Sequence, residues 1–140
     1  MLLDELKKAN IEAMKNKDKD ARSILSVVLT KCQLLSVEAK ANGKEITDSN
    51  VLEVIQKALK ELSDEKEGYS KVGNVERVNS ITYQEEFIKK YLPQQLTKEE
   101  IINIINSLED KSMPSVMKHF KMNYAGKVDM SLVSQIARGL

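Results

Sequence analysis

The stretch that decides the fold is residues 91–100, which read YLPQQLTKEE. Pro93 pushes the residue before it out of the helical region, so it ends any helix that precedes it. Thr97 and Glu100 stand three positions apart and form the pattern of a capping box, in which each side chain bonds the other residue's backbone N–H. One helix therefore stops and another begins within this stretch, which predicts a linker over residues 93–96.

Apolar residues that recur every three or four positions predict four helices before the linker. The expected ranges are about 2–16, about 21–41, from Thr47 or Asp48 to Gly68 or Gly73, and about 75–92. Asp18 or Asp20 would cap the second helix by accepting backbone N–H bonds, and Gly43 would stop it in a left-handed conformation. Leu34 lies beside its apolar stripe, so we expect this helix to be exposed on one side only.

The fourth predicted helix carries two patterns of polar and aromatic side chains. Glu85 falls on its apolar stripe, while Tyr83, Phe87 and Tyr91 follow one another at four-residue spacing on an adjoining face. Glu85 and Glu86 are adjacent carboxylates, but acid–base catalysis needs opposed groups in a pocket that shifts their pKa values. Adjacent acids on a helix are more typical of a solvated face, and that is the interpretation we adopt.

Three shorter helices are expected after the linker. The first follows the Thr97 cap and carries apolar positions such as Ile101 and Ile105. The second opens at Ser112, with a proline tolerated in its first turn, and its apolar face is formed by Met117, Phe120 and Tyr124. A turn over 125–128 then leads to the last helix, which Asp129 caps.

The chain is therefore predicted to be all-α, in two subdomains. Residues 1–92 would form an N-terminal four-helix bundle-like subdomain, and residues 97–140 a small C-terminal three-helix subdomain. The second, with about 44 residues, is near the lower limit for a domain that folds without disulfides or metals. We expect it either to lean on the first subdomain or to be stabilised when it docks on a partner.

Composition excludes several classes of protein. The 22 basic and 21 acidic residues leave a net charge of +1, which by itself does not favour nucleic acid. Cys32 is the single cysteine, lies on the apolar stripe of the second helix, and fits an inert thiol in a reducing compartment. No apolar run approaches the roughly 20 residues that cross a bilayer. We expect a cytoplasmic protein without a membrane partner, the alternative being the mature form of an organelle protein.

Known catalytic motifs are absent. The sequence has no P-loop, no glycine-rich dinucleotide motif, no nucleophile elbow, no zinc-protease motif and no C-x-x-C pair. His119 is the only histidine, and no serine stands in an elbow motif that could pair with it. The run Asp18–Lys19–Asp20 resembles the start of a calcium loop but lacks the glycine at position six and the glutamate at position twelve. We expect no catalytic residues, no metal and no cofactor.

The one uneven charge distribution lies at the end of the chain. Residues 1–96 hold 16 basic and 16 acidic residues, whereas residues 111–140 hold five basic residues and one acid, Asp129, a net of +4. The five bases are Lys111, Lys118, Lys121, Lys127 and Arg138. A compact basic face with a glycine-containing turn, here Gly126, suits phosphate contact. The alternative is an ordinary lysine-rich solvated face, and Asp129 argues for it, because this carboxylate already occupies a helix N-terminus that would attract an anion.

Three segments of the chain resemble the YqeY-like family. They are AMKNKDK at residues 13–19, YLPQQL at 91–96 and GKVDMSLV at 126–133, and the resemblance spans essentially all 140 residues. The family is related to the C-terminal tail of the GatB component of the tRNA-dependent Asp/Glu amidotransferase. The resemblance implies a helical bundle followed by a three-helix subdomain. It also implies help in holding tRNA, since amidation occurs in other domains of the amidotransferase. Family members often have a bulkier basic cluster where this chain reads HFKMNY at 119–124, which implies weak RNA affinity here.

Three hypotheses for function follow. The first is an accessory module that binds tRNA or another RNA, with Lys118, Lys121, Lys127 and Arg138 on phosphates beside Gly126 and with Tyr124 stacking on a base. The second is a protein–protein interaction adaptor, with a partner in tRNA aminoacylation or amidation. The third is a carbon–nitrogen ligase with glutamine as amido-N-donor, which is the activity that the relationship to the amidotransferase implies.

Overall fold

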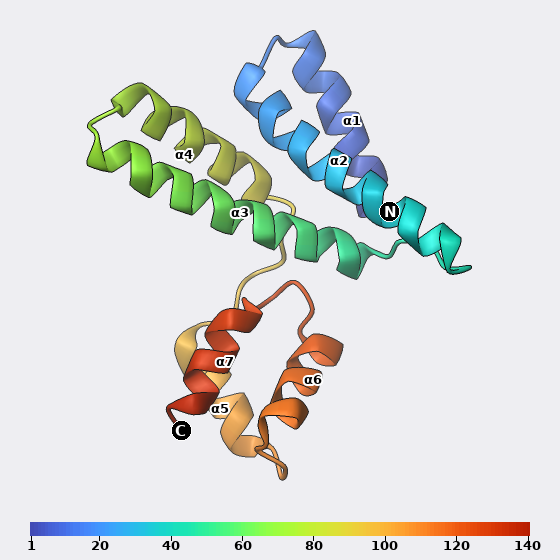
Figure 1. Ribbon diagram of the computed structural model, residues 1–140, viewed down its shortest axis with the longest axis vertical. Coiled ribbons are helices and arrows are strands. Elements are labelled where there is room, and N and C mark those ends of the chain that lie inside the picture. The colour runs from blue at the N-terminus through green and yellow to red at the C-terminus, as the bar shows by residue number, and fades with distance from the viewer. The chain divides into compact units, whose positions relative to one another are not determined.

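The computed structural model describes residues 1–140 and contains seven helices and no strand (Figure 1). The helices are α1 (Leu2–Lys15), α2 (Lys19–Ala41), α3 (Asp48–Lys71), α4 (Val75–Lys89), α5 (Lys98–Ser107), α6 (Met113–Asn123) and α7 (Met130–Arg138). The predicted all-α class is confirmed. None of the seven helices combines the length and the apolar content that crossing a bilayer requires.

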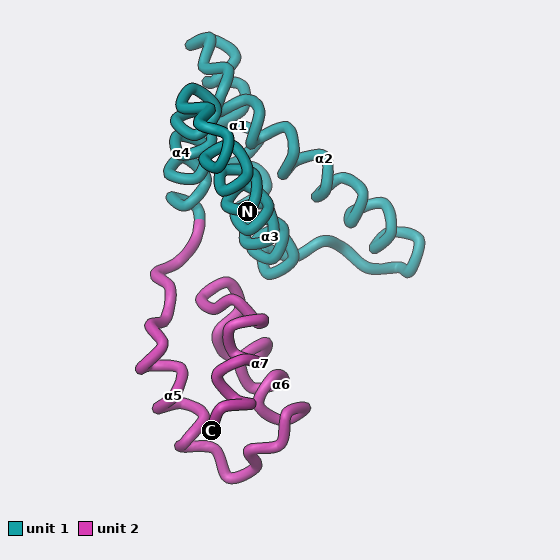
Figure 2. Tube along the Cα trace, turned by 60° about the vertical axis from the view of Figure 1, so that its left-hand side comes forward, with its two compact units in different colours: residues 1–91 teal, residues 92–140 magenta.

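The chain divides into two compact units, Met1–Tyr91 and Leu92–Leu140 (Figure 2). The first unit holds α1 to α4, and the second holds α5 to α7. Within the first unit, α1 packs on α2 and α3 packs on α4, so that two helical hairpins lie together (Figure 1). Helices α2 and α3 each contact all three of the other helices and together form the centre of this unit.

Side-chain caps and glycines set the helix boundaries. The Asp18 carboxylate accepts a first-turn backbone N–H of α2 at 3.1 Å, as one of the two predicted caps. Thr47 caps α3 in a capping box whose second member is Asn50. Gly43 and Gly73 follow α2 and α3 with φ of 71° and 70°. Only glycine adopts this left-handed region at no steric cost, so both helices end there.

Helix α4 ends three residues earlier than predicted, at Lys89 rather than Leu92. Pro93 explains the difference. It has no N–H to bond the carbonyl of Lys89, which is four residues earlier, and it also disfavours helical geometry at Leu92. Pro93 therefore ends α4 although it lies beyond the helix, because it lacks an N–H donor and its ring clashes with Leu92.

The core of the first unit is apolar and is supplied mainly by α2 and α3. Its buried apolar side chains are Leu6, Ala13, Ala21, Ile24, Leu25, Val28, Cys32, Val51, Val54, Ile55, Ala58, Leu62, Ile81 and Ile88. Burial raises the pKa of the Cys32 thiol. This side chain is 1% exposed, which fits the inert role expected for it.

The expectation that α2 is exposed on one side only is wrong for its last turns. Leu34 is 62% exposed and Leu35 is 36% exposed, and no side chain in residues 33–41 is buried. Helix α2 has 23 residues whereas its hairpin partner α1 has 14. Because α2 is nine residues longer and each residue adds about 1.5 Å, the last turns of α2 extend roughly 13 Å past α1.

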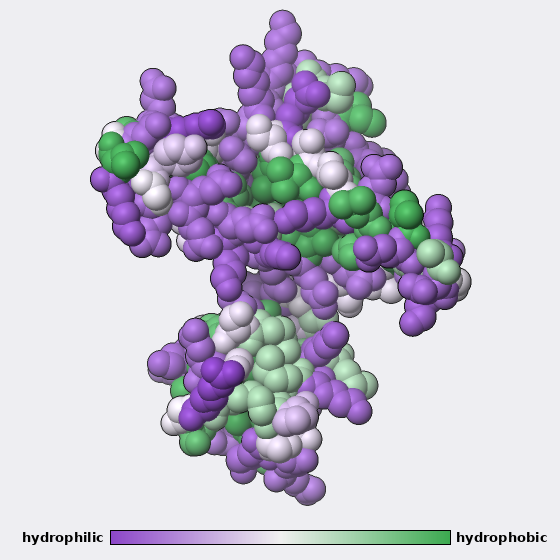
Figure 3. Space-filling view, viewed as in Figure 1, coloured by the Kyte–Doolittle hydropathy of each residue, from purple (hydrophilic) through white to green (hydrophobic).

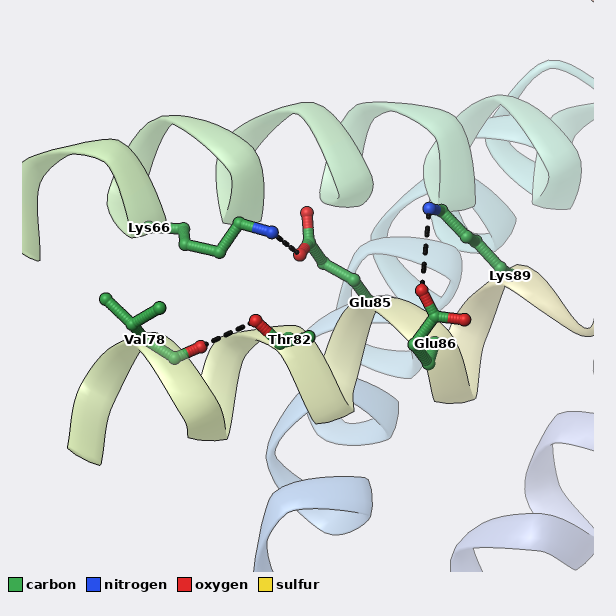
Figure 4. A network of polar contacts seen from close by, with 6 residues as sticks. All are labelled: Lys66, Val78, Thr82, Glu85, Glu86 and Lys89. Atoms are coloured by element: carbon green, nitrogen blue, oxygen red, sulfur yellow. Dashed lines mark hydrogen bonds and ion pairs between the residues drawn. The ribbon is translucent and has the colours of Figure 1, made fainter. Parts of the chain in front are cut away.

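A partly buried ion pair joins α3 to α4 (Figure 4). The Glu85 side chain is 10% exposed, and its Oε1 accepts a hydrogen bond from Lys66 Nζ at 2.6 Å. Its neighbour Glu86 is exposed and pairs with Lys89 at 3.8 Å. A solvated face is thus the correct interpretation for Glu86 and the wrong one for Glu85. Glu85 shares the buried side of α4 with Ile88, three residues further on.

The aromatic residues of α4, together with Tyr91 just after it, form a continuous row. The ring centroids of Tyr83 and Phe87 lie 6.5 Å apart, and those of Phe87 and Tyr91 lie 6.2 Å apart. The Tyr83 hydroxyl donates a hydrogen bond to Asp18, the cap of α2, and this bond raises the pKa of Tyr83. Lys90 Nζ lies 4.2 Å from the centroid of the Phe87 ring. The unit's own side chains therefore engage this row, which ties α4 to the start of α2.

The second unit has a core of its own. It consists of Ile101, Ile105, Val116, Phe120, Val128, Val133 and Ile136. Phe120 is the largest of the fully buried side chains. Met117 and Tyr124 of the predicted apolar face are partly buried and pack against this core, and Val116, which was not predicted, is fully buried in it. Val116 and Met117 both lie on the same side of the helix as Phe120, but Val116 is the one that points into the core.

Candidate nucleic-acid interface

The turn between α6 and α7 is held by the segment that precedes α5. Gly126 adopts a φ of 77° and is buried, and its carbonyl accepts a hydrogen bond from Gln95 Nε2 at 2.6 Å. The carbonyl of Lys127 accepts the backbone N–H of Leu96 at 2.8 Å. The two sequence segments at 91–96 and 126–133 are therefore bonded to each other. The backbone of Lys127 is fixed while its side chain is exposed.

Sequence reasoning missed the part that Gln95 and Leu96 play in this turn. Both residues belong to one of the segments that resemble the YqeY-like family, but they were interpreted only as a linker. The signal was present in the amide of Gln95, which can donate to two carbonyls at once. In the structure it bonds the carbonyl of Pro93 at 2.9 Å as well as that of Gly126.

Lys118 and Lys121 lie on the exposed side of α6. They are three residues apart, so they are neighbours on the helix surface, and both are exposed, while Val116 and Phe120 face the core. Lys121 stands in the last turn of α6, where a cation is also stabilised by the helix dipole. The structure thus brings these two lysines together, and it leaves Lys121 a role in helix stability as well.

Tyr124 is half-buried and packs on its own helix. Its ring centroid lies 5.5 Å from that of Phe120 and 5.9 Å from that of His119. The side chain of His119 in turn has that of Asn123 as a neighbour at 3.3 Å. The ring of Tyr124 therefore already stacks within the protein and supports the end of α6, which favours a structural role over stacking on a base.

Arg138 lies at the far end of α7 from the turn. It is in the last turn of that helix, and Met130 is in the first. Eight residue steps separate the two, which is about 12 Å along the helix axis. The structure therefore does not gather Arg138 with Lys127. The C-terminus of a helix also accounts for a cation there through the helix dipole.

The basic side chains of the second unit have no acidic partners. All five ion pairs of the protein lie within the first unit. Two of the five acids of the second unit are engaged in caps of helix N-termini: Asp129 accepts the N–H of Ser131 at 2.9 Å, and Glu100 completes the capping box of α5. Lys118, Lys121 and Lys127 have no ion pair and are therefore free to bind an anion.

The positive field of the second unit is nevertheless local. Residues 92–140 hold six basic and five acidic residues, a net of +1. The +4 region begins only at Lys111. Glu99 and Glu100 begin α5 just after Leu96, whose N–H bonds Lys127, so acids also stand near the turn. This arrangement offers a few phosphate contacts rather than a broad basic surface.

Asp110 gives the second unit a measurable dependence on pH. Its carboxylate accepts the N–H of Ser112 at 2.9 Å and the hydroxyl of Ser115 at 2.7 Å, which together hold the start of α6. The backbone bond from Ser112 contributes most to a pKa that lies below the ordinary value of 3.8. A lowered pKa in the folded state stabilises the fold above the unfolded pKa, and this contribution is lost as the pH falls through the folded pKa.

We therefore expect the Asp110→Asn variant to be less stable than the wild type at pH 7 and to approach it as the pH falls below 3.8 and through the lowered folded pKa. The measurement is thermal unfolding of both proteins between pH 2 and pH 7, followed at residues of α6. A difference that stays constant over this pH range would contradict the assigned cause.

The fold and this surface define a class of protein. It is an all-helical protein with a four-helix unit followed by a small three-helix unit that presents unpaired lysines. A family comparison narrows the class: the profile of the family described as Yqey-like protein matches residues 3–140, and the chain belongs to this family. No curated protein matches the chain. The resemblance drawn from the three sequence segments is thus confirmed.

Proposed function

We propose that the second unit is an RNA-binding module, with tRNA as its ligand, and that Lys118, Lys121 and Lys127 bind phosphates. The single observation that carries this proposal is that these three exposed lysines lie on α6 and its following turn without an acidic partner. Phosphate contacts of this kind supply most of the affinity in sequence-independent binding.

The held turn supports the same proposal. Because Gln95 and Leu96 bond Gly126 and Lys127, the backbone at Lys127 does not have to be ordered when a ligand binds. Arg138, at the far end of α7, would add a contact only for an RNA long enough to reach along that helix. We assign Tyr124 to support of α6 rather than to base stacking, because its ring already packs on Phe120 and His119.

The number of contacts sets the expected affinity. A few phosphate contacts give a dissociation constant of about 10⁻⁴ to 10⁻⁶ M at physiological salt. Each contact contributes roughly −0.7 to −0.9 to the slope of log K against log salt, so three contacts predict a loss of roughly 20- to 40-fold between 50 and 200 mM salt. This salt dependence distinguishes phosphate binding from an interaction that depends on apolar contact.

The test is tRNA binding by fluorescence anisotropy across a salt series, with the variant Lys118→Glu/Lys121→Glu. We expect this variant to bind at least about tenfold more weakly and to show a shallower salt slope. A matched control is Lys57→Glu/Lys60→Glu, because these residues of α3 are also exposed and three positions apart. Both variants change the net charge equally. Equal losses in the two variants, or no loss in either, would refute the assigned site.

The adaptor hypothesis, with a protein partner in aminoacylation or amidation, has less support at the aromatic row of α4 because Asp18 and Lys90 already engage that row. The ligase hypothesis has no support from the side chains that could take part in catalysis. The only histidine, His119, lies beside Asn123, and the single cysteine is buried in the first unit. We therefore propose the RNA-binding function alone.

A further inference from the structure

Helix α2 carries a second uncharged face, opposite the one that packs in the core. It consists of Ser23, Val27, Thr30, Leu34, Val37 and Ala41, which we call the α2 seam. All six residues are exposed. Val27, Leu34 and Val37 are 43%, 62% and 61% exposed, and they are among the largest apolar side chains on the surface. In the space-filling view, patches of hydrophobic surface lie among hydrophilic residues on the first unit (Figure 3).

The spacing of the seam is that of a helix–helix interface. Its members are separated by four, three, four, three and four positions, which is the 3.5-residue repeat of a two-stranded coiled coil. Single exposed apolar residues are common on any protein. The seam differs from such isolated residues, because none of its six positions is charged although 31% of the residues in the chain are. Depletion of charge is typical of the buried centre of an interface.

Nothing in the first unit covers the seam. The buried residues of α2 are Ala21, Ile24, Leu25, Val28 and Cys32, and they occupy the other side of the helix. The seam spans 18 residue steps, or about 27 Å, and its last part lies on the turns that extend beyond α1. A long partner helix can therefore lie along it without displacing any packed element.

The charges beside the seam point to a second copy of this chain. Lys31 and Glu38 lie on the same flank of the seam, seven residues apart. A two-fold axis between them places Lys31 of each copy opposite Glu38 of the other, because antiparallel helices bring the same flank of both copies together. A parallel pair would instead set Gln33 opposite Glu38 and gain no ion pair. We propose that α2 pairs antiparallel with α2 of a second copy along this seam.

The pairing is expected to be weak. With Lys31 opposite Glu38, the two helices overlap along the seam only from Thr30 to Ala41, so each copy contributes Leu34, Val37 and two small residues. This interface is at the low end of specific complexes, so the dissociation constant should be on the order of 100 μM. Lys31 now bonds Glu61 of its own chain at 3.1 Å. Both of these side chains are substantially exposed, so giving up that pair costs little.

The test uses charge reversal in two variants of the full chain, analysed by sedimentation equilibrium. Lys31→Glu alone places two acids opposite each other, and Glu38→Lys alone places two bases opposite each other, so each variant should dimerise at least about tenfold more weakly than the wild type. An equimolar mixture restores both opposite-charge pairs and should dimerise at least as well as the wild type. A wild-type chain that stays monomeric, or a mixture that does not recover, would overturn the proposal.

A second pair of variants separates loss of the seam from loss of the fold. Val37→Glu places a charge in the seam and should abolish the dimer. Val72→Glu makes the same change at another exposed valine, 77% exposed, which lies outside the seam, and it should leave the dimer unchanged. Circular dichroism of both variants should show the wild-type helix content. Dimerisation of Val37→Glu at the wild-type strength would also overturn the proposal.

Discussion

The Phe120→Ala variant is expected to unfold the second unit while the first unit remains folded. Phe120 is fully buried at the centre of the core of this unit. Removing a buried phenylalanine side chain costs about 3–5 kcal/mol, from the lost transfer free energy and from the cavity that remains. A unit of 49 residues has little stability to lose.

The size of the unit decides the outcome. Domains hold about 0.05–0.15 kcal/mol of stability per residue, so a unit of this size holds roughly 2–7 kcal/mol. A loss of about 3–5 kcal/mol exceeds the lower part of this range and takes a large share of the upper part. The effect is confined to one unit, because every buried residue of the core around Phe120 follows the linker at residues 93–96.

Residue-resolved amide hydrogen exchange is the measurement for this variant. Protection should be lost across α5 to α7 and retained across α1 to α4. The control is Met122→Ala on the same helix, where the side chain is 72% exposed and the change should be within about 0.5 kcal/mol. Equal loss of protection in both units would contradict two separately folded units, and full retention would contradict the assigned core.

The Glu85→Ala variant is expected to destabilise the first unit by about 2 kcal/mol, because it removes a charge-assisted hydrogen bond and leaves the Lys66 amine, which is only 35% exposed, without its partner. The Glu85→Leu variant combined with Lys66→Met should recover most of this loss. Apolar side chains of similar volume often replace a buried ion pair at no cost.

Both effects are measured by unfolding the first unit in urea and monitoring amide exchange in α3 and α4. Figure 4 also shows the pair that serves as the control, Glu86 and Lys89. Both of these side chains are more than half exposed. Glu86→Ala should change the stability by less than about 0.5 kcal/mol, because exposed ion pairs contribute little. If Glu85→Ala and Glu86→Ala had equal effects, burial of the Glu85 pair would have no energetic consequence.

Interactions within a few residues of chain were predictable. The caps at Asp18, Thr97 and Asp129 and the stop at Gly43 depend on one residue and its near neighbours, and each acts where it was predicted. Pro93 also ends α4, but three residues earlier than predicted. The position of the basic residues on the exposed side of α6 was predictable for the same reason. A helix has 3.6 residues per turn, so the period of the apolar residues also determines which residues share a face.

The tertiary structure alone decided which of those faces are buried. The burial of Glu85 depends on Lys66, 19 residues away, and the holding of Lys127 depends on Leu96, 31 residues away. The spacing of apolar residues would equally allow the face that carries Leu34 to be buried. It is exposed because α1 is too short to reach it. Local sequence therefore determined the seven helices, their caps and the positions of the charges. Burial, ion pairing and the fixed turn at Gly126 were decided by packing between helices, because those free energies come from contacts that only the folded chain makes.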